Sequence, residues 1–514
     1  MVAEERAPAV QEPAGPQVAV LAVDVGTSST KGVLVAADGS ILGTAVREHD
    51  VQRPTPGCVE MDAEVWWEEF TSIARELTTA HPKAEVQSVG VSGMGPCVLL
   101  TTEDGTPVRP AILYGVDTRA TAQIQRLTEE LGEQEILERG GSVLTTQAAG
   151  PKIAWVRENE PDVYARARRL LMPASFLAYR LTGEYVLDHH SASQCSPLYD
   201  SAALAWHEPW WQQVAEGIEA PALRWPADQA GTVTEQAAQA TGLPAGIPVV
   251  TGSIDAWTEA VSADAQNPGD LMLMYGTTMF LVATSEQRTM SRTLWGTVGA
   301  FPGTYCLAGG MATSGAITGW LRRLTGDAPY AQLVKGAAEA GPGAGGLLML
   351  PYFAGERTPV QDPDARGTLI GLTLDHGRGH LYRAALEATA FGVRHNLEAL
   401  REGGAPISRV VAVGGGTQGG LWTQIVSDIT GIEQVVPTST IGASYGAAIL
   451  AADHAPGIDG TATERAAQWN PPAQTLTPDP SLTALYDELY SHYRALYPAT
   501  AQIAHALSDL QRRR

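Results

Sequence analysis

A glycine turn rich in hydroxyl side chains follows the first apolar run of the chain. Residues 24–31 read DVGTSSTK, at the end of the run VAVLAVDV. Because glycine lets backbone N–H groups converge and the hydroxyls add donors, such a turn can hold phosphate oxygens. Asp24 could hold Mg²⁺ through water molecules, as magnesium is held beside nucleotide phosphates. The segment lacks the GxxxxGK[ST] pattern of a P-loop, and a plain β-hairpin turn is the alternative.

A second candidate is a single carboxylate, Asp255, at the end of the segment TGSID. It follows the apolar run IPVV and opens a stretch of helical character, AWTEAVSAD. At that position a carboxylate can cap the helix, which requires no chemistry. It can also act as a general base, because phosphoryl transfer needs one carboxylate to orient a hydroxyl and accept its proton. The local pattern leaves both roles open.

A third motif, GGGTQG at residues 414–419, fits G-x-G-x-x-G between the strand-like RVVAV and the helix-like LWTQIVSDITG. Taken literally it predicts a Rossmann oxidoreductase that binds NAD(P), with Glu433 near the distance for a ribose contact. The motif lies late in the chain, however. Gly-Thr turns occur twice, 250 residues apart, at 26–28 and 276–278, and have no role in a dehydrogenase. Glycines are equally useful where an adenosine lies against backbone.

The surrounding pattern predicts α/β layers that position these turns. Strands are expected at 18–25 and at VQSVGVSG, with a hairpin turn at Asp38-Gly39. Residues 64–79 have helical spacing, with Asp62 available as the cap. The turn at 267–270 begins a second strand–turn–strand unit that echoes the first, which indicates two related halves. We expect residues 453–480 to form a surface excursion, and a helix from about Leu482 to Tyr497 to close the chain.

Length and composition also indicate two large domains. The 514 residues exceed what one hydrophobic core usually organises, and 18% charged and 44% hydrophobic residues are typical of globular proteins. The formal net charge of −22 opposes attraction to phosphate backbones and anionic lipids, so we expect no nucleic-acid partner and no membrane partner. No run of about 18 apolar residues is present. A homodimer is compatible with these features.

Cysteine usage and the first residues indicate a cytoplasmic protein. The four cysteines form no CxxC pair, which favours reduced thiols over a disulfide framework or a zinc site. Residues 1–16 have no apolar core of a secretory signal and are expected to be a disordered leader. Asp188-His189-His190 could suggest metal ligands, but adjacent histidines point in different directions and no third ligand is evident. A polar pocket lining is the favoured reading.

Together these segments resemble the FGGY carbohydrate kinases, the sugar and polyol kinases of the actin-like ATPase superfamily, and within that family the xylulokinase type. The likeness spans about residues 18–455. Its motifs are, in order, DVGTSSTKG, VEMDAEVWWEE, RPAILYGVDTRA, GSIDAW, GDLMLMYGTTMF, LPYFAGERTPVQDPDARGTLIGLT, VVAVGGGTQGGLWTQIVSDITG and GASYGAAILAA. The order of these motifs argues against the dinucleotide-binding alternative. A non-catalytic actin-like module that binds ATP is a further alternative, against which the presence of Asp24 and Asp255 argues.

The resemblance implies an α/β fold of two actin-like (ribonuclease H-like) domains that close over ATP and a small sugar or polyol. After the leader, the expected boundaries are 17–262 for the N-terminal sugar-binding domain and 263–455 for the C-terminal nucleotide-binding domain. A C-terminal extension, 456–514, would contain the closing helix. The implied cofactors are ATP and Mg²⁺, and the implied reaction is transfer of the γ-phosphoryl group to a hydroxyl of the sugar.

Individual residues take roles from the same resemblance. Asp24 is expected near Mg²⁺, and Asp255 matches the catalytic aspartate that abstracts the proton of the attacking hydroxyl. The implied nucleotide contacts come from three turns: Gly26, Thr27 and Ser28; Gly276, Thr277 and Thr278; and Gly414, Gly415 and Gly416.

The sugar pocket departs from the family pattern. Xylulokinases read Gly-Gln-Met-His after the strand that here is VQSVGVS, whereas this chain reads SGMGP at 92–96, without the histidine. In the next motif an extra residue precedes the acidic and basic pair of GVDTR. Because the pocket is remodelled, the substrate name is not carried over from the resemblance. The expected acceptor is a ketopentose such as xylulose, a tetritol, another polyol or a linear signalling sugar. The candidate lining residues are Met94, Gly95, Tyr114, Asp117, Arg119, His189 and His190, together with Asp255.

Overall fold

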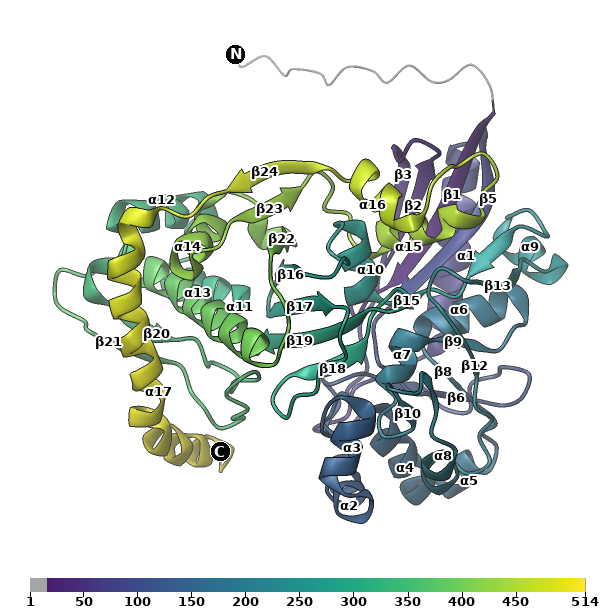
Figure 1. Cartoon of the computed structure of the whole chain (residues 1–514), viewed down its shortest axis with the longest axis horizontal. Coiled ribbons are helices and arrows are strands. Elements are labelled where there is room, and N and C mark those ends of the chain that lie inside the picture. The colour runs from purple at the N-terminus through teal and green to yellow at the C-terminus, as the bar shows by residue number, and fades with distance from the viewer. Residues whose placement is uncertain (1–15, 514) are drawn as a thin grey trace.

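Two seven-stranded mixed sheets with helices on their faces form the body of the protein (Figure 1). The computed structural model describes residues 16–513, so residues 1–15 of the predicted leader lie outside the described part. The architecture confirms the predicted α/β class. None of the helices in the described part of the chain combines the length and the apolar composition needed to cross a lipid bilayer.

The first sheet is built around β1 (Gln17–Val25), which runs parallel to β5 (Ala84–Gly93) and antiparallel to β2 (Ser29–Ala36). The last seven residues of β1 are buried, because helices cover both faces of the sheet. The strand order is β13 (Gln229–Thr232), β14 (Pro248–Val250), β5, β1, β2 and β3 (Ile41–Glu48), with the short β15 (Ser253–Ile254) beside β5.

Alternate residues of β1 serve two different cores. Leu21 and Val23 pack with Trp66 and Phe70 of α1 (Ala63–Ala80), which begins after Asp62, whose carboxylate accepts the Glu64 N–H. This confirms the predicted helix and its cap. On the other face, Val20 and Ala22 pack against α15 (Ala443–Ala451), a helix from much later in the chain. The C-terminal half of the sequence therefore contributes a helix to the first sheet, as Figure 1 shows.

The second sheet repeats this plan. Its central strand β16 (Asp270–Tyr275) is antiparallel to β17 (Met279–Ser285) and parallel to β22 (Arg409–Val413). The full order is β18 (Trp295–Val298), β19 (Tyr305–Met311), β17, β16, β22, β23 (Gln434–Pro437) and β24 (Pro472–Leu476). The predicted strand–turn–strand echo of the chain's beginning is confirmed, since β1–β2 and β16–β17 are both antiparallel pairs joined at a Gly-Thr turn.

Helices cover this sheet as well. On one face lie α13 (Arg378–Glu402), α14 (Leu421–Thr430) and the long α17 (Thr483–Arg512). On the other, Trp257 and Ala260 of α10 (Asp255–Ser262) join a core that includes Met272 and Val282. Because α10 also packs against α15, these two helices connect the halves of the molecule.

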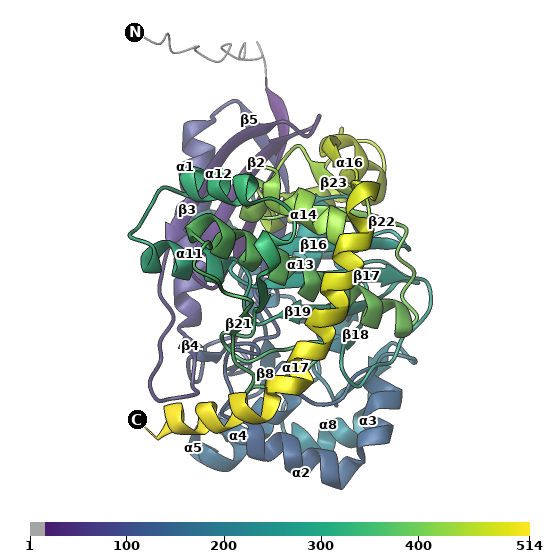
Figure 2. The ribbon, with the colours of Figure 1, turned by 90° about the vertical axis from the view of Figure 1, so that its left-hand side faces the viewer.

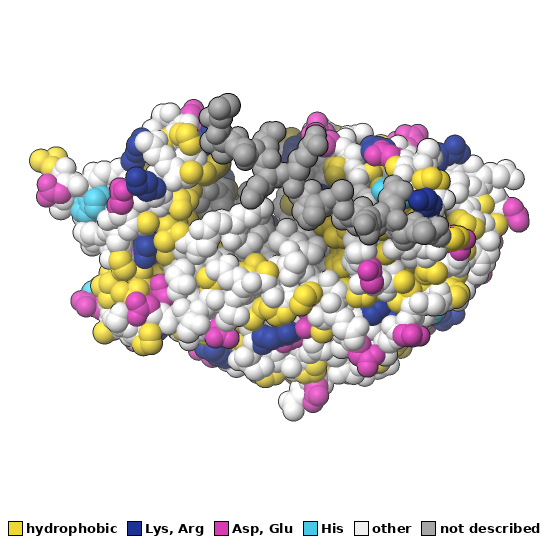
Figure 3. Space-filling model, turned by 90° about the horizontal axis from the view of Figure 1, so that it is seen from above, with side chains coloured by type: hydrophobic (Ala, Val, Ile, Leu, Met, Phe, Trp, Pro, Cys, Tyr) yellow, Lys and Arg dark blue, Asp and Glu magenta, His cyan; other side chains and the backbone are white. Residues whose placement is uncertain are grey.

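Seen from above, basic side chains lie in small separate groups among acidic ones (Figure 3).

The expected surface excursion at 453–480 is mostly exposed, although part of it is regular structure, and the expected end of the closing helix was wrong. Residues 453–480 include α16 (Ala462–Trp469), which starts with a reciprocal Thr461–Glu464 capping box, and β24, which pairs with β23. The closing helix does not stop near Tyr497 but passes Pro498 and continues to Arg512, across the outside of the second half (Figure 2). Contacts beyond the proline hold it, since Ser508 is buried and donates to the Asp364 carboxylate.

Candidate active site

Two candidate carboxylates reach the same edge of the first sheet although they are far apart in sequence. In the parallel pair of β1 and β5, Asp24 lies opposite Ser92, and Ser92 in turn lies opposite Ser253 of β15. Asp255 follows directly after β15. The ends of three neighbouring strands therefore bring Asp24 and Asp255 to one place.

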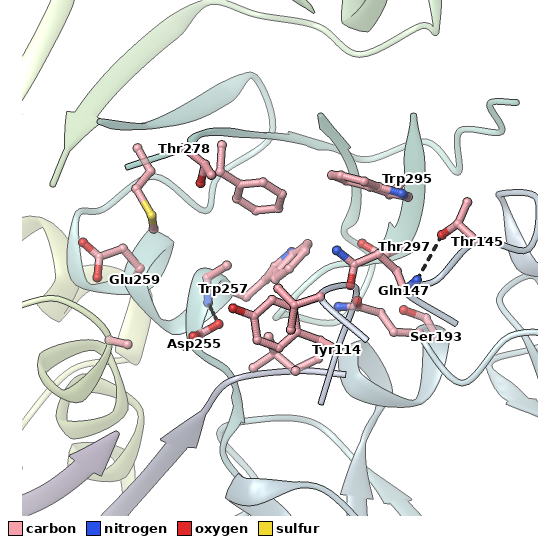
Figure 4. Close-up of a pocket in the computed structure, with 18 of the residues that line it drawn as sticks. Tyr114, Thr145, Gln147, Ser193, Asp255, Trp257, Glu259, Thr278, Trp295 and Thr297 are labelled. Atoms are coloured by element: carbon pink, nitrogen blue, oxygen red, sulfur yellow. Dashed lines mark hydrogen bonds between the residues drawn. The ribbon is translucent and has the colours of Figure 1, made fainter. Parts of the chain in front are cut away.

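A third carboxylate, Glu259, joins them. With Asp24 and Asp255 it lines a cavity of about 370 Å³ between the two halves (Figure 4). Glu259 stands one helical turn after Asp255 on α10, so both side chains occupy the same helix face. A Cβ placed on Gly442 would lie 2.4 Å from Glu259 Oε2, so this glycine leaves room for the carboxylate.

Asp255 is not a side-chain cap of α10. The cap position is Ile254, and Asp255 is the first residue of the helix. Its Oδ1 accepts the Ala256 N–H at 2.7 Å, which orients the carboxylate without tying its second oxygen to the helix. The purely structural alternative weighed from the sequence therefore does not describe this residue.

Burial gives the three carboxylates unusual proton affinities. It raises the pKa of Asp255 to about 7, with the nearby charge of Asp24 adding to the effect. Burial likewise raises the pKa of Glu259 to about 7, again with Asp24 contributing. The pKa of Asp24 rises less, to about 6, because the Ser92 hydroxyl donates to this carboxylate at 2.9 Å and Lys31 is close. The site therefore has carboxylates able to exchange a proton near neutral pH.

The first Gly-Thr turn joins β1 to β2 beside these carboxylates. The N–H of Gly26 donates to Ser29 O at 3.0 Å, which closes the turn. Thr27 Oγ1 lies 3.0 Å from the Tyr114 hydroxyl, and Ser28 is exposed. Tyr114 itself lines the cavity. This turn therefore connects the cavity wall to the edge of the first sheet.

The second Gly-Thr turn joins β16 to β17 and rests on a helix start. The N–H groups of Gly315 and Ala316, at the start of α11 (Gly315–Leu324), donate to the carbonyls of Gly276 and Thr277. Thr277 is exposed, and Thr278 lines the cavity. The second turn thus reaches the cavity through Thr278, and the first turn is tied to the cavity wall through the contact between Thr27 and Tyr114.

The triple glycine lies beside the second turn. Because β16 and β22 are parallel and pair Met274 with Val413, the turns that follow them are neighbours. Gly414 has a φ of 90°, and a Cβ there would lie 2.7 Å from Tyr275 O. Nothing would obstruct a Cβ on Gly415, whereas Gly416 packs on Tyr275 and Trp422. Backbone is therefore exposed at this turn for a flat ligand group.

The structure separates the predicted sugar-binding residues into two sets. Gly95 and Tyr114 line the cavity, and Met94 is buried behind it. Asp117 and Arg119 do not line it. Asp117 is fully buried and accepts the Val59 N–H and a bidentate pair from Arg119, which also contacts Glu60. These two residues therefore form an internal ion pair.

The two adjacent histidines lie behind the cavity wall. His189 Nδ1 is 2.7 Å from the Tyr199 hydroxyl, and its ring lies beside Trp225. His190 is fully buried and contacts Val298, Gln194 and Trp257. No group of His, Cys, Asp or Glu within residues 16–513 is arranged to hold a metal ion by itself.

Several lining residues were not anticipated. Glu259 had a usable signal, since a residue four positions after Asp255 in a predicted helix must share its face. The others come from loops, from the short helix α7 (His189–Ser193) and from the outer strand β18, and no local pattern marked them: Gln147, Ser193, Gln194, Trp295 and Thr297.

Comparisons with known proteins agree with this arrangement. Residues 19–262 match the N-terminal domain, and residues 271–455 the C-terminal domain, of the FGGY family of carbohydrate kinases. The chain is 28% identical over 481 residues to a xylulose kinase of Escherichia coli (strain K12), covering 93% of this chain and 98% of that protein. It is 29% identical over 469 residues to a glycerol kinase of Janthinobacterium sp. (strain Marseille), covering 88% and 92%.

Among solved structures, the xylulose kinase from Rhodospirillum rubrum superposes with a TM-score of 0.88 at 32% identity, covering 95% of this chain and all of that one. This likeness confirms the expected two-domain actin-like fold. The dinucleotide-binding alternative is not favoured, and Glu433 lies within reach of Thr477 instead, at 3.4 Å. With both halves matched in order, the chain belongs to the FGGY family of carbohydrate kinases and is an ATP-dependent sugar kinase.

Proposed function

We propose that the protein transfers the γ-phosphoryl group of ATP to a hydroxyl of a ketopentose such as xylulose or of a related polyol. The observation that carries this proposal is that Asp24, Asp255 and Thr278 of the second Gly-Thr turn line one cavity, while the first Gly-Thr turn begins two residues after Asp24. Relatives named xylulose kinase and glycerol kinase support an uncharged acceptor with a reactive hydroxyl.

Asp255 is the proposed general base. Its raised pKa of about 7 suits a group that accepts a proton from a hydroxyl near neutral pH. The Ala256 N–H holds one carboxylate oxygen, so the other can approach the acceptor hydroxyl. In line with general schemes for phosphoryl transfer, the chain contributes mainly positioning and charge, and proton removal is one step among these.

Asp24 is the proposed contact to Mg²⁺. The donor set fits this metal, because magnesium beside phosphates is usually held by one or two carboxylates together with water and phosphate oxygens. When bound, Mg²⁺ would neutralise charge on the transferring phosphoryl group. The Ser92 hydroxyl, which also lies 2.7 Å from Thr258 Oγ1, keeps the Asp24 carboxylate oriented and favours its ionised form.

The three glycine turns are the proposed nucleotide site. The turns at 26–28 and 276–278 would hold phosphate oxygens from the two halves, and the turn at 414–416 would lie against the adenosine. Neighbouring strand ends bring the last two turns together, which supports this division. Because the net charge of −22 repels a nucleotide anion, these backbone N–H groups and the metal must supply the local attraction.

A panel of acceptors tests the proposal. ADP release is measured with ketopentoses, tetritols, pentitols and glycerol at saturating Mg·ATP. We expect release above the acceptor-free rate with at least one of them. Absence of acceptor-stimulated release across the panel, by protein that still binds ATP, contradicts the proposal and favours a non-catalytic ATP-binding module.

The remaining expectations on partners and location belong to this proposal. The four cysteines are unpaired, as suits a cytoplasmic protein. A homodimer is proposed as the solution state, and the exposed apolar row of Ile503, Leu507 and Leu510 on α17 is the surface that it would cover. Light scattering coupled to size exclusion measures this directly, and a monomer at assay concentration contradicts it.

A further inference from the structure

The cavity has two chemically different ends. Asp24, Asp255 and Glu259 occupy one end. The other is formed by residues 142–148, 193–196 and 295–297, and these three segments contribute no charged side chain to the lining. In Figure 4, Asp255 and Glu259 lie on one side and Gln147, Thr145, Ser193, Trp295 and Thr297 on the other, with Tyr114 and Trp257 between them.

Aromatic rings form a continuous wall along the cavity. The ring centroids of Trp257 and Phe280 are 6.1 Å apart, and those of Phe280 and Trp295 are 6.0 Å apart. The rings come from α10, β17 and β18, so both halves of the chain contribute. Apolar ring faces next to neutral amides and hydroxyls suit a ligand with a carbon backbone and many hydroxyl groups.

Gln194 is held in one orientation by a buried histidine. His190 Nδ1 is 2.6 Å from Val298 O, and because a carbonyl only accepts, Nδ1 has the proton. His190 Nε2 must then accept, and the Gln194 Nε2 amide donates to it at 2.8 Å. Burial lowers the pKa of His190 to about 3, so the ring stays neutral. Gln194 therefore keeps its carbonyl oxygen free of a partner in the described part of the chain.

Gln147 is held by its carbonyl oxygen, whereas Gln194 is held by its amide NH₂ group. Gln147 Oε1 accepts the Gly115 N–H at 3.0 Å, which leaves its NH₂ group as an unused donor among the described residues. Gly115 follows Tyr114, so this bond also ties Gln147 to the wall beside Asp255. Thr297 is 7% exposed, and its hydroxyl has no hydrogen-bond partner among residues 16–513. The neutral end thus has one fixed acceptor, one fixed donor and a hydroxyl without a partner.

We propose that Gln147 and Gln194 bind the hydroxyls at the non-reacting end of an uncharged polyol or open-chain sugar, and that they determine acceptor specificity. This inference rests on the proposed function. The Gln147 amide donates to a substrate oxygen, and the Gln194 carbonyl accepts from a substrate hydroxyl. Arg357 also lines the cavity, so the expected preference for an uncharged acceptor rests on the three segments themselves, where a carboxylate would face the Gln194 oxygen.

The test compares Gln194→Leu and Gln147→Leu with the parent, using the acceptor that the parent phosphorylates best. Loss of a hydrogen bond to a buried polar group predicts a rise in the acceptor KM of about tenfold or more. The KM for ATP and the acceptor-free ATPase rate should stay within about twofold, because neither residue belongs to the proposed nucleotide turns. Gln239→Leu, at an exposed position of α9 (Glu235–Thr241), is the matched control.

His190 is a positioning residue, and a double variant tests this role. If His190 acts only through Gln194, His190→Phe raises the acceptor KM, and adding it to Gln194→Leu raises the KM no further. Additive effects contradict the positioning role. Unchanged acceptor KM in both glutamine variants overturns the inference while leaving the proposed function standing. Preference for aldonates over the matching polyols also overturns it. Absence of turnover with every acceptor refutes the proposed function, and this inference with it.

Discussion

Glu259→Gln is expected to move the pH dependence of turnover. Two carboxylates one helical turn apart are separated by about 6 Å, and at an effective dielectric of about 20 they repel by about 3 kcal/mol. Water in the open cavity reduces this repulsion to about half. The remaining energy corresponds to a change of about one unit in the pKa of Asp255. Asp255 can accept a proton only when ionised, and its pKa of about 7 places the loss of activity on the acid side.

The assay is kcat/KM for the acceptor between pH 5.5 and 9, which reports the groups of the free enzyme. The parent should lose half of its maximal value near pH 7. In Glu259→Gln that midpoint should fall toward pH 6, because Asp255 contributes to the raised pKa of Glu259 and the repulsion between the two carboxylates is mutual. Glu488→Gln, at an exposed position of α17, should leave the midpoint unchanged. An unmoved or raised midpoint in the Glu259 variant refutes the electrostatic reasoning.

Two further predictions concern the nucleotide turns and the junction of the two halves. Thr27→Val and Thr277→Val should each weaken ATP binding about five- to tenfold, measured by calorimetry, and unchanged affinity in both variants argues against the phosphate-loop assignment. Gly446→Ala would place a Cβ 1.8 Å from a backbone carbonyl of α10. It should therefore reduce the free energy of unfolding by about 2 kcal/mol or more and lower the melting temperature. Gly377→Ala, where a Cβ meets open space and the backbone is ordinary, should leave the melting temperature unchanged.

Elements that depend on local pattern were predictable from the sequence. The first helix followed from spacing of 3.6 residues, its Asp62 cap and the hairpin at Gly39 from cap and turn chemistry, and the strand at the centre of each sheet from an apolar run. Even the continuous apolar run of β1 was informative, because only a strand covered on both faces needs one.

Contacts between segments far apart in the sequence were harder to predict. The pairing of Asp24 with Asp255 depends on the order of β1, β5 and β15, which no local spacing reveals. The packing of α15 on the first sheet is equally non-local, since it joins residues of β1 and β5 to a helix from the other half of the chain. Family resemblance, rather than periodicity, allowed the two carboxylates to be placed in one site.

The acceptor pocket shows where sequence neighbours mislead. Tyr114 and Asp117 are three residues apart, yet Tyr114 lines the cavity while Asp117 is fully buried against Arg119. Gln147 and Gln194 lie in segments with no distinctive motif, and only the folded chain brings them together. A polar residue on a loop has the same appearance in sequence whether it faces solvent or a ligand.

The central claim is that Asp255 removes the proton of the acceptor hydroxyl at a cavity shared with ATP. Asp255→Asn preserves shape while removing the basic carboxylate. Acceptor-dependent ADP release should fall by about 10²- to 10⁴-fold, with the Kd for ATP within about twofold of the parent. Full acceptor-dependent turnover by Asp255→Asn would contradict the account.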